Sequence, residues 1–257
     1  MSSTVSTSTP LGDAAIMLRR NLKHTLRNPI TVFNAILLPV VIMLMFVYVM
    51  GGTFNVGEKY IEYATPGLLV MGISYGLGAT ATDVNDDMTK GIINRFKVMD
   101  VSRGSVLTGH VIITMLRCVV ACAAITGVAF AVGFRSSASA LDWLGAAGLV
   151  ILLSFGAGWL TVGMGLAATT PASAGLGTVP LILLPFLSSA FAPANTMAEG
   201  VRQFAEYQPF TPIIETLRGL LTGSHPTTGH TVAAFAWCVG FAVVGYVWAV
   251  ASFKKRA

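Results

Sequence analysis

Long apolar runs separated by short polar stretches dominate the chain. A helix of about 20 apolar residues crosses the roughly 30 Å hydrocarbon core of a bilayer, and six runs approach or exceed that length. These runs are Ile30–Met50, Ala64–Thr82, His110–Phe134, Trp143–Thr169, Leu176–Phe191 and Val232–Phe253. The pattern predicts an all-α membrane protein with six transmembrane helices.

The fifth run, Leu176–Phe191, is the shortest and contains Pro180 and Pro185. Proline removes a backbone donor and interrupts a helix. We therefore expect this span to be kinked or incomplete. The backbone groups that it frees need partners from neighbouring helices, because a membrane offers them no water.

The polar N-terminal stretch divides into two parts. Residues 1–9 are mostly Ser and Thr, which predicts a disordered tail. Residues 10–28 place Leu18, Leu22 and Leu26 near one helical face and most basic residues elsewhere, which predicts an amphipathic helix on the membrane surface. No cleavable signal peptide is expected, because the first apolar run is longer than a signal core.

A second long connection, residues 192–231, precedes the last span. It contains two short helical patterns, Met197–Tyr207 and Ile213–Leu221, separated by Gln208-Pro209-Phe210-Thr211-Pro212. One interpretation is an extracellular re-entrant hairpin, which is tolerated only where protein or water covers its backbone. The other is an extracellular cap that packs at the membrane interface.

The composition agrees with a membrane location and one domain. Hydrophobic residues make up 54% of the chain and charged residues 11%, against roughly 25% charged in an ordinary soluble domain. The six runs take up about half of the chain and are joined by short connections, which leaves no room for a separate soluble domain, so we expect a single transmembrane domain over residues 10–257.

The net charge is +5, and the basic residues cluster at the ends of apolar runs. This arrangement orients a protein in a bilayer, so we expect membrane lipids and no nucleic acid as contacts. Most Lys and Arg residues of the loops and ends fall on the same side of the membrane as the N-terminus. Because Lys and Arg are enriched on the cytoplasmic side, both termini are predicted to be cytoplasmic.

Few residues offer catalytic or metal-binding chemistry. All three cysteines lie inside predicted spans, and the four histidines are scattered without a ligand spacing, so no metal site and no catalytic residue is expected. The glycines inside the spans are expected to allow close helix packing. Arg117 is charged and lies within the third span, where it either snorkels to the cytoplasmic surface or has a functional role.

The longest charged interruption, residues 83–103, lies between the second and third spans. Its segment Gly91-Ile92-Ile93-Asn94-Arg95-Phe96, followed by Ser102-Arg103, resembles the ABC-2 type permease family. So does Gln208-Pro209-Phe210-Thr211-Pro212, followed by Glu215 and Arg218-Gly219-Leu220-Leu221. Among subfamilies, the chain looks most like the bacterial drug-efflux permeases of the daunorubicin-resistance type. It departs from the family at Asp100, where proline is common.

The resemblance implies the membrane half of an ATP-binding-cassette exporter in the bacterial plasma membrane, with two copies of a separate ATPase subunit. The chain has no GxxxxGK[ST] phosphate loop, so it is not expected to be an enzyme, and ATP and Mg are expected on the partner. Residues 83–103 would form a cytoplasmic coupling loop, with a coupling helix over Asn85–Phe96 that docks on the ATPase. The residues expected at that contact are Asp87, Gly91, Ile92, Ile93, Arg95 and Phe96.

The resemblance also implies a dimer, expected to be a homodimer, with the substrate route between its halves. A hydrophobic or amphipathic substrate, such as a drug or lipid, would pass Phe33, Asn34, Tyr75, Phe186 and Phe191. The expected gate residues in the re-entrant segment are Pro209, Thr211, Glu215 and Arg218. The alternatives are a secondary transporter, which usually has inverted repeats, another multi-span protein without an ATPase partner, and a membrane-embedded enzyme.

Overall fold

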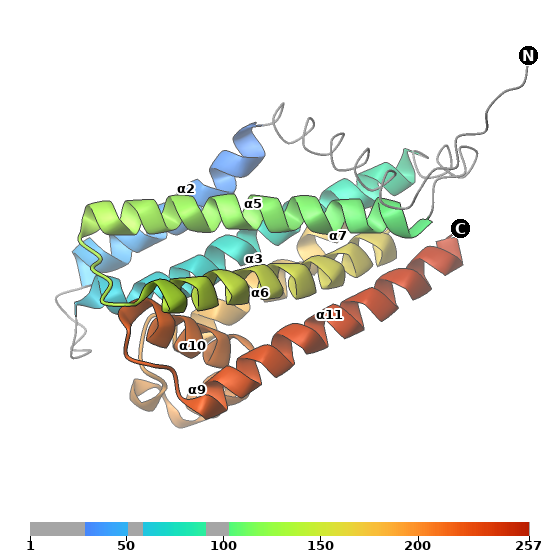
Figure 1. Cartoon of the computed structure of the whole chain (residues 1–257). Coiled ribbons are helices and arrows are strands. Elements are labelled where there is room, and N and C mark those ends of the chain that lie inside the picture. The colour runs from blue at the N-terminus through green and yellow to red at the C-terminus, as the bar shows by residue number, and fades with distance from the viewer. Residues whose placement is uncertain (1–28, 51–58, 91–102, 257) are drawn as a thin grey trace, which may run out of the picture.

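The computed structural model describes residues 29–50, 59–90 and 103–256, and every regular element in these ranges is helical (Figure 1). The predicted N-terminal tail and surface helix lie outside the described residues. The elements in chain order are α2 (Pro29–Met45), the π-helix η1 (Phe46–Met50), α3 (Tyr60–Thr89), α5 (Arg103–Val132), α6 (Ala140–Ala167), α7 (Pro171–Gly177), α8 (Val179–Leu183), the 3₁₀ helices η2 (Leu184–Leu187) and η3 (Ala194–Thr196), α9 (Glu199–Tyr207), α10 (Phe210–Thr222) and α11 (Thr228–Arg256).

Four long helices, α3, α5, α6 and α11, form the body of the molecule and lie side by side (Figure 1). The short helices α9 and α10 gather at one end, which we call the α10 end. The opposite end holds α7, the C-terminal ends of α3 and α11, and the start of α5, and we call it the α7 end.

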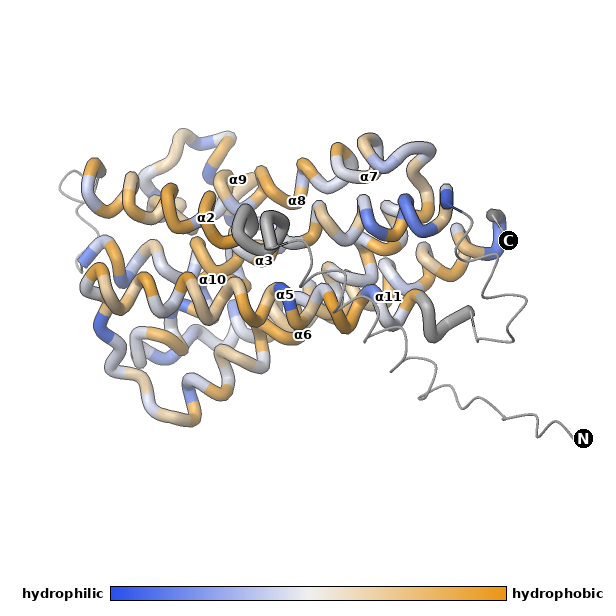
Figure 2. The backbone as a smooth tube through the Cα atoms, turned by 90° about the horizontal axis from the view of Figure 1, so that it is seen from above, coloured by the Kyte–Doolittle hydropathy of each residue, from blue (hydrophilic) through white to orange (hydrophobic). Residues whose placement is uncertain are grey.

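Three described helices are long and apolar enough to cross a membrane, over Leu107–Val132, Ala140–Ala167 and Thr228–Lys255. Shorter apolar stretches cover Ile36–Val49 and Pro171–Leu187. Figure 2 shows hydrophobic residues along most of the helices, with hydrophilic ones mainly near the two ends. The protein is therefore an all-helical integral membrane protein, as predicted.

The helix boundaries differ from the predicted spans mainly at the α7 end. Helix α3 continues to Thr89, seven residues beyond the predicted span, so the first part of the predicted loop 83–103 is a continuation of that helix. Contacts with α5 and α6, described below, give the polar residues of this stretch partners inside the bundle. Helix α5 likewise begins at Arg103, before the predicted His110.

The fifth predicted span is interrupted, as its two prolines indicated. A capping box of Thr170 and Ser173 starts α7, which ends at Gly177. Pro180 then lies at the start of α8 and Pro185 at the start of η2, where a missing N–H costs no helical hydrogen bond. Residues 188–193 follow without regular helix.

Glycines allow α6 and α11 to approach each other closely, which agrees with the predicted packing role. A Cβ atom added at Gly156 would lie 2.5 Å from the Cys238 carbonyl oxygen, and one at Gly245 would lie 2.3 Å from the Leu160 nitrogen. Even a single Cβ atom does not fit at these distances, so the two glycines set the spacing of α6 and α11.

Candidate functional site

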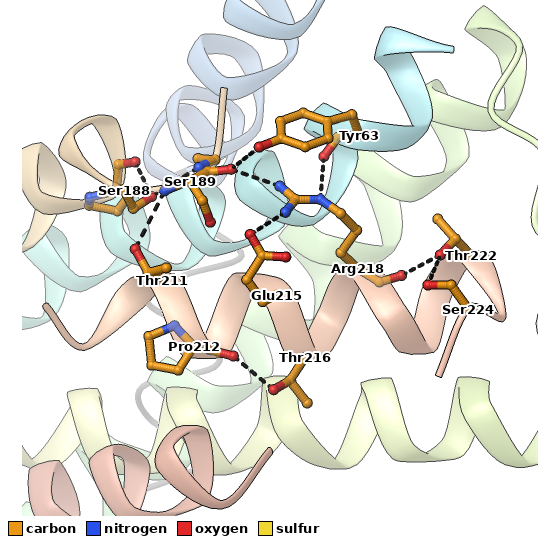
Figure 3. Close-up of polar contacts among 12 residues, drawn as sticks. Tyr63, Ser188, Ser189, Thr211, Pro212, Glu215, Thr216, Arg218, Thr222 and Ser224 are labelled. Atoms are coloured by element: carbon orange, nitrogen blue, oxygen red, sulfur yellow. Dashed lines mark hydrogen bonds and ion pairs between the residues drawn. The ribbon is translucent and has the colours of Figure 1, made fainter. Parts of the chain in front are cut away.

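A buried arginine joins three segments at the α10 end. The Arg218 side chain of α10 donates from Nε to the Tyr63 carbonyl oxygen at 3.1 Å and from Nη2 to the Ser189 carbonyl oxygen at 2.8 Å. Its Nη1 donates to Glu215 at 2.6 Å, and its guanidinium lies 3.8 Å from the centre of the Tyr63 ring. Figure 3 shows this network, in which three contacts in different directions fix the guanidinium.

The non-helical segment Ser188–Phe191, which we call the strap, receives most of its hydrogen bonds from side chains. Tyr60 donates to the Phe191 carbonyl oxygen at 3.0 Å, and Tyr63 donates to the Ser189 carbonyl oxygen at 2.9 Å. These donors supply the partners that a membrane cannot, so irregular backbone is tolerated here.

The strap also lies directly against α3. A Cβ atom added at Gly67 would lie 2.5 Å from the Ala190 Cβ atom. Only glycine lets the two backbones come so close at this position. The Arg218 network and the strap therefore form one packed unit with the start of α3.

An open cleft of about 480 Å³ adjoins this network. Its lining combines carboxylates, hydroxyls and an amide with the ring of a buried tyrosine: Tyr63, Ser189, Pro193, Ala194, Asn195, Glu206, Thr211, Glu215, Arg218 and His230. We call it the α10-end cleft.

Aromatic rings extend from the network across the end of α2. The Tyr63 and Tyr60 ring centres are 6.4 Å apart, and Phe46 stacks on Phe191 at 4.5 Å. Phe186 lies 5.6 Å from Phe191. We call these five rings the aromatic cluster; Tyr60, Tyr63 and Phe191 are buried in it, whereas Phe186 is 37% exposed.

Ion pairs join α3 to α5 near the α7 end. Arg117 Nη1 lies 2.9 Å from the Asp83 carboxylate, and His110 Nε2 lies 3.3 Å from the Asp87 carboxylate. The hydroxyls of Thr80 and Thr114 are 2.7 Å apart. We call this set the α3–α5 clasp.

A further side chain of α3 reaches α6. The Asn85 amide donates to the carbonyl oxygens of Gly165 and Ala168 at 3.0 and 2.6 Å. Carbonyl groups at the C-terminal end of a helix lack intrahelical partners, so this buried side chain caps α6. The clasp and Asn85 together fix the end of α3 from two sides.

Of the predicted coupling residues, only Asp87 lies within the part of the chain that the structure describes. Asp87 is on α3 and contacts His110. Gly91, Ile92, Ile93, Arg95 and Phe96 lie outside the described residues, as does Asp100. The described part of the predicted coupling segment is thus held by the bundle.

The structure gathers some predicted substrate-path residues. Phe186 and Phe191 share the aromatic cluster. Tyr75 lies 15 residues after Tyr60 on α3, roughly 22 Å along the helix axis, and is a partly buried residue that packs against the hydrophobic core. Phe33 and Asn34 belong to α2, but their side chains are outside the described residues.

Three of the predicted gate residues, Thr211, Glu215 and Arg218, lie around the strap. Thr211 Oγ1 accepts a hydrogen bond from the Ser189 backbone N–H at 3.4 Å, and Glu215 pairs with Arg218. Pro209 directly precedes α10 and lines a shallow groove with Phe204 and Tyr207.

Several contacts were not predicted from the sequence. Tyr60 and Tyr63 are three residues apart on one helical face, a spacing that marks them as a pair. Asn85 stands among aspartates in a polar stretch, so nothing in the local pattern marked it as buried. The partner of Arg117 had no local signal, because Asp83 is 34 residues away.

Comparison with known proteins places the chain in a family. The model of the ABC-2 type transporter family matches residues 13–222, most of the chain. The chain belongs to the ABC-2 type transporter family. This confirms the resemblance drawn from the 91–103 and 208–221 segments.

Two curated relatives belong to the same kind of transporter. The chain is 28% identical over 219 residues to the daunorubicin resistance ABC transporter permease protein DrrB1 of Streptomyces coeruleorubidus, covering 84% of this chain and 76% of that protein. It is 25% identical over 232 residues to a probable doxorubicin resistance ABC transporter permease protein, DrrC, of Mycobacterium tuberculosis strain CDC 1551 / Oshkosh, covering 89% and 83%. This ABC-2 chain is a transmembrane permease subunit of an ABC exporter, and its ATPase partner is a separate subunit.

Proposed function

We propose that this permease exports a hydrophobic or amphipathic substrate, such as a drug or lipid, across a bacterial plasma membrane. Its relatives carry daunorubicin and doxorubicin resistance in their names, which favours a drug. The working unit is a homodimer of six-span halves with two ATPase subunits, which bind ATP and Mg. Both termini are cytoplasmic, so the α7 end faces the ATPases, and residues 192–231 form an outer re-entrant hairpin.

One observation carries the mechanism: α3 is a single helix from Tyr60 to Thr89. It is about 45 Å long at 1.5 Å per residue. At the α10 end it holds the strap through Tyr60 and Tyr63, and at the α7 end it holds the clasp through Asp83 and Asp87. Movement of the coupling loop thus passes along α3 to the strap.

ATP binding closes the ATPases and moves the coupling loops that begin after α3. The clasp joins α3 to α5, so the two helices move together and shift the halves between inward-open and outward-open states. Such a shift requires that the docked ATPase make different contacts in the two states. The coupling residues are Asp87, Gly91, Ile92, Ile93, Arg95 and Phe96.

The route runs between the two halves beside the aromatic cluster. Apolar side chains of α2, among them Val41 and Met45, and of the α8–η2 segment, among them Leu183 and Leu187, are exposed on the described chain. Helices α2 and α8 lie along one edge of the molecule in Figure 2. A second half that covers this edge would bury these side chains and place Phe186 at the route.

Export assays on the permease with its ATPase test the proposal. Inside-out vesicles should accumulate a fluorescent amphipathic dye only with ATP, and Phe96→Asp should abolish uptake while membrane insertion stays normal. ATP hydrolysis by the Phe96→Asp complex should continue without transport. Normal ATP-dependent uptake by Phe96→Asp would show that the ATPase docks elsewhere.

Orientation and assembly need separate tests. An impermeant thiol reagent should fail to label cysteines introduced at Ser2 or Ala257 in intact cells. Two differently tagged copies of the permease should purify together in detergent. Labelling at either terminus would reverse the topology, and separation of the tagged copies would contradict the homodimer.

A further inference from the structure

An apolar groove of about 190 Å³ runs between α5 and α6, which lie side by side in Figure 1. Among the described residues, none of those that line it belongs to α2 or α8, so it lies apart from the edge proposed for the second half. Its floor is buried and includes Leu69, Cys122 and Leu217. Its rim is exposed and includes Val119, Ala123, Ala147 and Ile151. We call this feature the α5–α6 groove.

Small residues keep the groove open. Ala123 of α5 and Ala147 of α6 lie on its rim, where longer side chains would fill the space. A Cβ atom added at the nearby Gly127 or Gly148 would have open space around it. Small residues normally bring membrane helices into close contact, as the glycines between α6 and α11 do. Here they leave a gap between two helices that other protein atoms do not fill.

The groove offers too few polar partners for water. Thr126 has the only hydroxyl among its lining residues, and the Cys122 thiol donates to the Leu69 carbonyl oxygen at 3.7 Å. A buried water needs about two to four polar partners. Apolar side chains that face an empty space lose dispersion contacts. The groove therefore favours an apolar occupant.

The depth of the groove matches one leaflet of a bilayer. The rim lies within two helices that are long and apolar enough to cross a membrane. On α6 the lining residues run from Trp143 to Ile151, three and eleven residues after the first residue, Ala140. At 1.5 Å per residue they lie about 5 and 17 Å along the helix. One leaflet contributes about 15 Å of hydrocarbon. A single acyl chain that enters from the α10 end can thus follow the groove.

Trp143 stands where such a chain would meet its headgroup. It is partly exposed at the start of α6, and its ring stacks with that of Phe130 at 6.0 Å. Tryptophan is enriched at the boundary between hydrocarbon and water. This ring marks the end of the groove that faces the headgroups.

Arg135 supplies a positive charge at the same end. Its Nη1 donates to the carbonyl oxygens of Phe130 and Phe134 at 3.2 and 2.9 Å, which leaves Nε and Nη2 to donate to a phosphate. The guanidinium is exposed. The Asp142 carboxylate accepts hydrogen bonds from the backbone and hydroxyl of Ser139, so it is engaged in the cap of α6.

We propose that the α5–α6 groove holds an acyl chain of a membrane phospholipid whose phosphate contacts Arg135. The lipid is a resident of the protein, distinct from the exported substrate, and fills the space between α5 and α6. The inference goes beyond the export function and does not depend on it, because the groove would hold a lipid whatever the permease carries.

Photocrosslinking of the permease–ATPase complex in nanodiscs tests this assignment. The probe is a phosphatidylethanolamine with a diazirine near the middle of one acyl chain. Peptide mass spectrometry should find Ile151 labelled severalfold more than Val239 of α11. Val239 is 50% exposed, does not line the groove and lies eleven residues after the start of its helix, as Ile151 does. Equal labelling of the two residues would indicate ordinary contact with bulk lipid and overturn the proposal.

A larger side chain on the rim should displace the lipid. Ala123→Phe should reduce the labelling of Ile151 severalfold and leave that of Val239 unchanged. Ala131→Phe is the matched control, because Ala131 is exposed on the same helix but does not line the groove. Co-purification with the ATPase would confirm that both variants fold. The same Ile151 labelling in both variants would count against the groove.

The phosphate contact has a separate test. A diacylglycerol with the same diazirine chain lacks the phosphate and should label Ile151 severalfold less than the phospholipid does. Arg135→Gln should remove this difference by lowering the labelling from the phospholipid alone. Equal labelling of wild type by the two lipids would refute the contact with Arg135.

Two other occupants would give different results. A photoreactive amino acid at Ile151 that cross-links two copies of the permease would place a second copy in the groove. Loss of lipid labelling on addition of the amphipathic dye from the export assay would make the groove part of the substrate route. Either result would overturn the assignment of a resident lipid.

Discussion

The Arg117 guanidinium in α5 lies 2.9 Å from the Asp83 carboxylate in α3. The side chain of Arg117 is 10% exposed and that of Asp83 32% exposed, so the pair is partly shielded from solvent. Of the two interpretations left open for Arg117, the contact favours a specific role, because the charge has a partner on the helix that leads into the predicted coupling loop.

Breaking this pair should weaken the clasp. We expect Arg117→Gln and Asp83→Asn each to destabilise the protein by about 1–2 kcal/mol, a value reduced because Asp83 is nearly a third exposed. Thermal unfolding in detergent would measure the loss. The charge-reversed double variant Asp83→Arg with Arg117→Asp should recover part of it, and an additive loss would show that the two side chains do not act together.

The cap that Asn85 places on α6 makes a second prediction. Asn85→Ala removes two donors from buried carbonyl groups, so we expect a loss of about 2–3 kcal/mol. Thr89→Ala is the matched control, because Thr89 is exposed and its hydroxyl bonds only to its own helix. Equal melting temperatures for the two variants would contradict the capping role.

Arg218 should not be replaceable by lysine. Lysine keeps the charge but cannot donate in three fixed directions to Tyr63, Ser189 and Glu215. We expect Arg218→Lys to cost about 2–3 kcal/mol, measured by thermal unfolding. Arg202→Lys, in a pair whose side chains are nearly half exposed, should cost less than about 0.5 kcal/mol.

The close approach of α6 and α11 predicts that replacing two glycines of α6 by alanine changes stability to different extents. Gly156→Ala should destabilise the protein by about 1–3 kcal/mol, because the added Cβ meets the Cys238 carbonyl oxygen. Gly148→Ala has open space around it and should be neutral or slightly stabilising. The melting temperatures of the two variants in detergent would show whether the close spacing of α6 and α11 determines the stability of the protein.

The ion pair of Lys90 and Asp86 at the end of α3 should contribute equally to stability throughout the neutral pH range. A hydrogen bond to Asp86, 2.5 Å long, raises the pKa of Lys90 above its usual value. A raised lysine pKa contributes stability that is complete below the unfolded value of about 10.4 and is lost as the pH rises through the folded value. The difference in melting temperature between wild type and Lys90→Gln should therefore stay constant from about pH 6 to 9, and a change within that range would contradict the assignment.

The sequence pattern was most informative where a local rule governs the structure. Apolar run length located the long helices, and Pro180 and Pro185 correctly predicted the interrupted fifth span, because a missing N–H acts within a few residues. The pattern also placed a helix close to the observed α10. Local chemistry decides each of these features.

Contacts between distant segments were the part that the pattern could not supply. Arg218 bonds to Tyr63, 155 residues earlier, and Asn85 bonds to Gly165, 80 residues later. The continuation of α3 from Thr82 to Thr89 has the same cause, because the polar residues of this stretch have partners on α5 and α6 that no local pattern shows.

The contact between Arg218 and the strap also bears on how the protein is made. The carbonyl oxygen of Ser189 is synthesised well before the Arg218 side chain that bonds to it, and the Tyr63 carbonyl oxygen earlier still. During biogenesis, the α10 end of the bundle would therefore close only after α10 has emerged from the ribosome. A nascent chain that stops before residue 218 would insert its early helices and leave this end open to quality-control proteases.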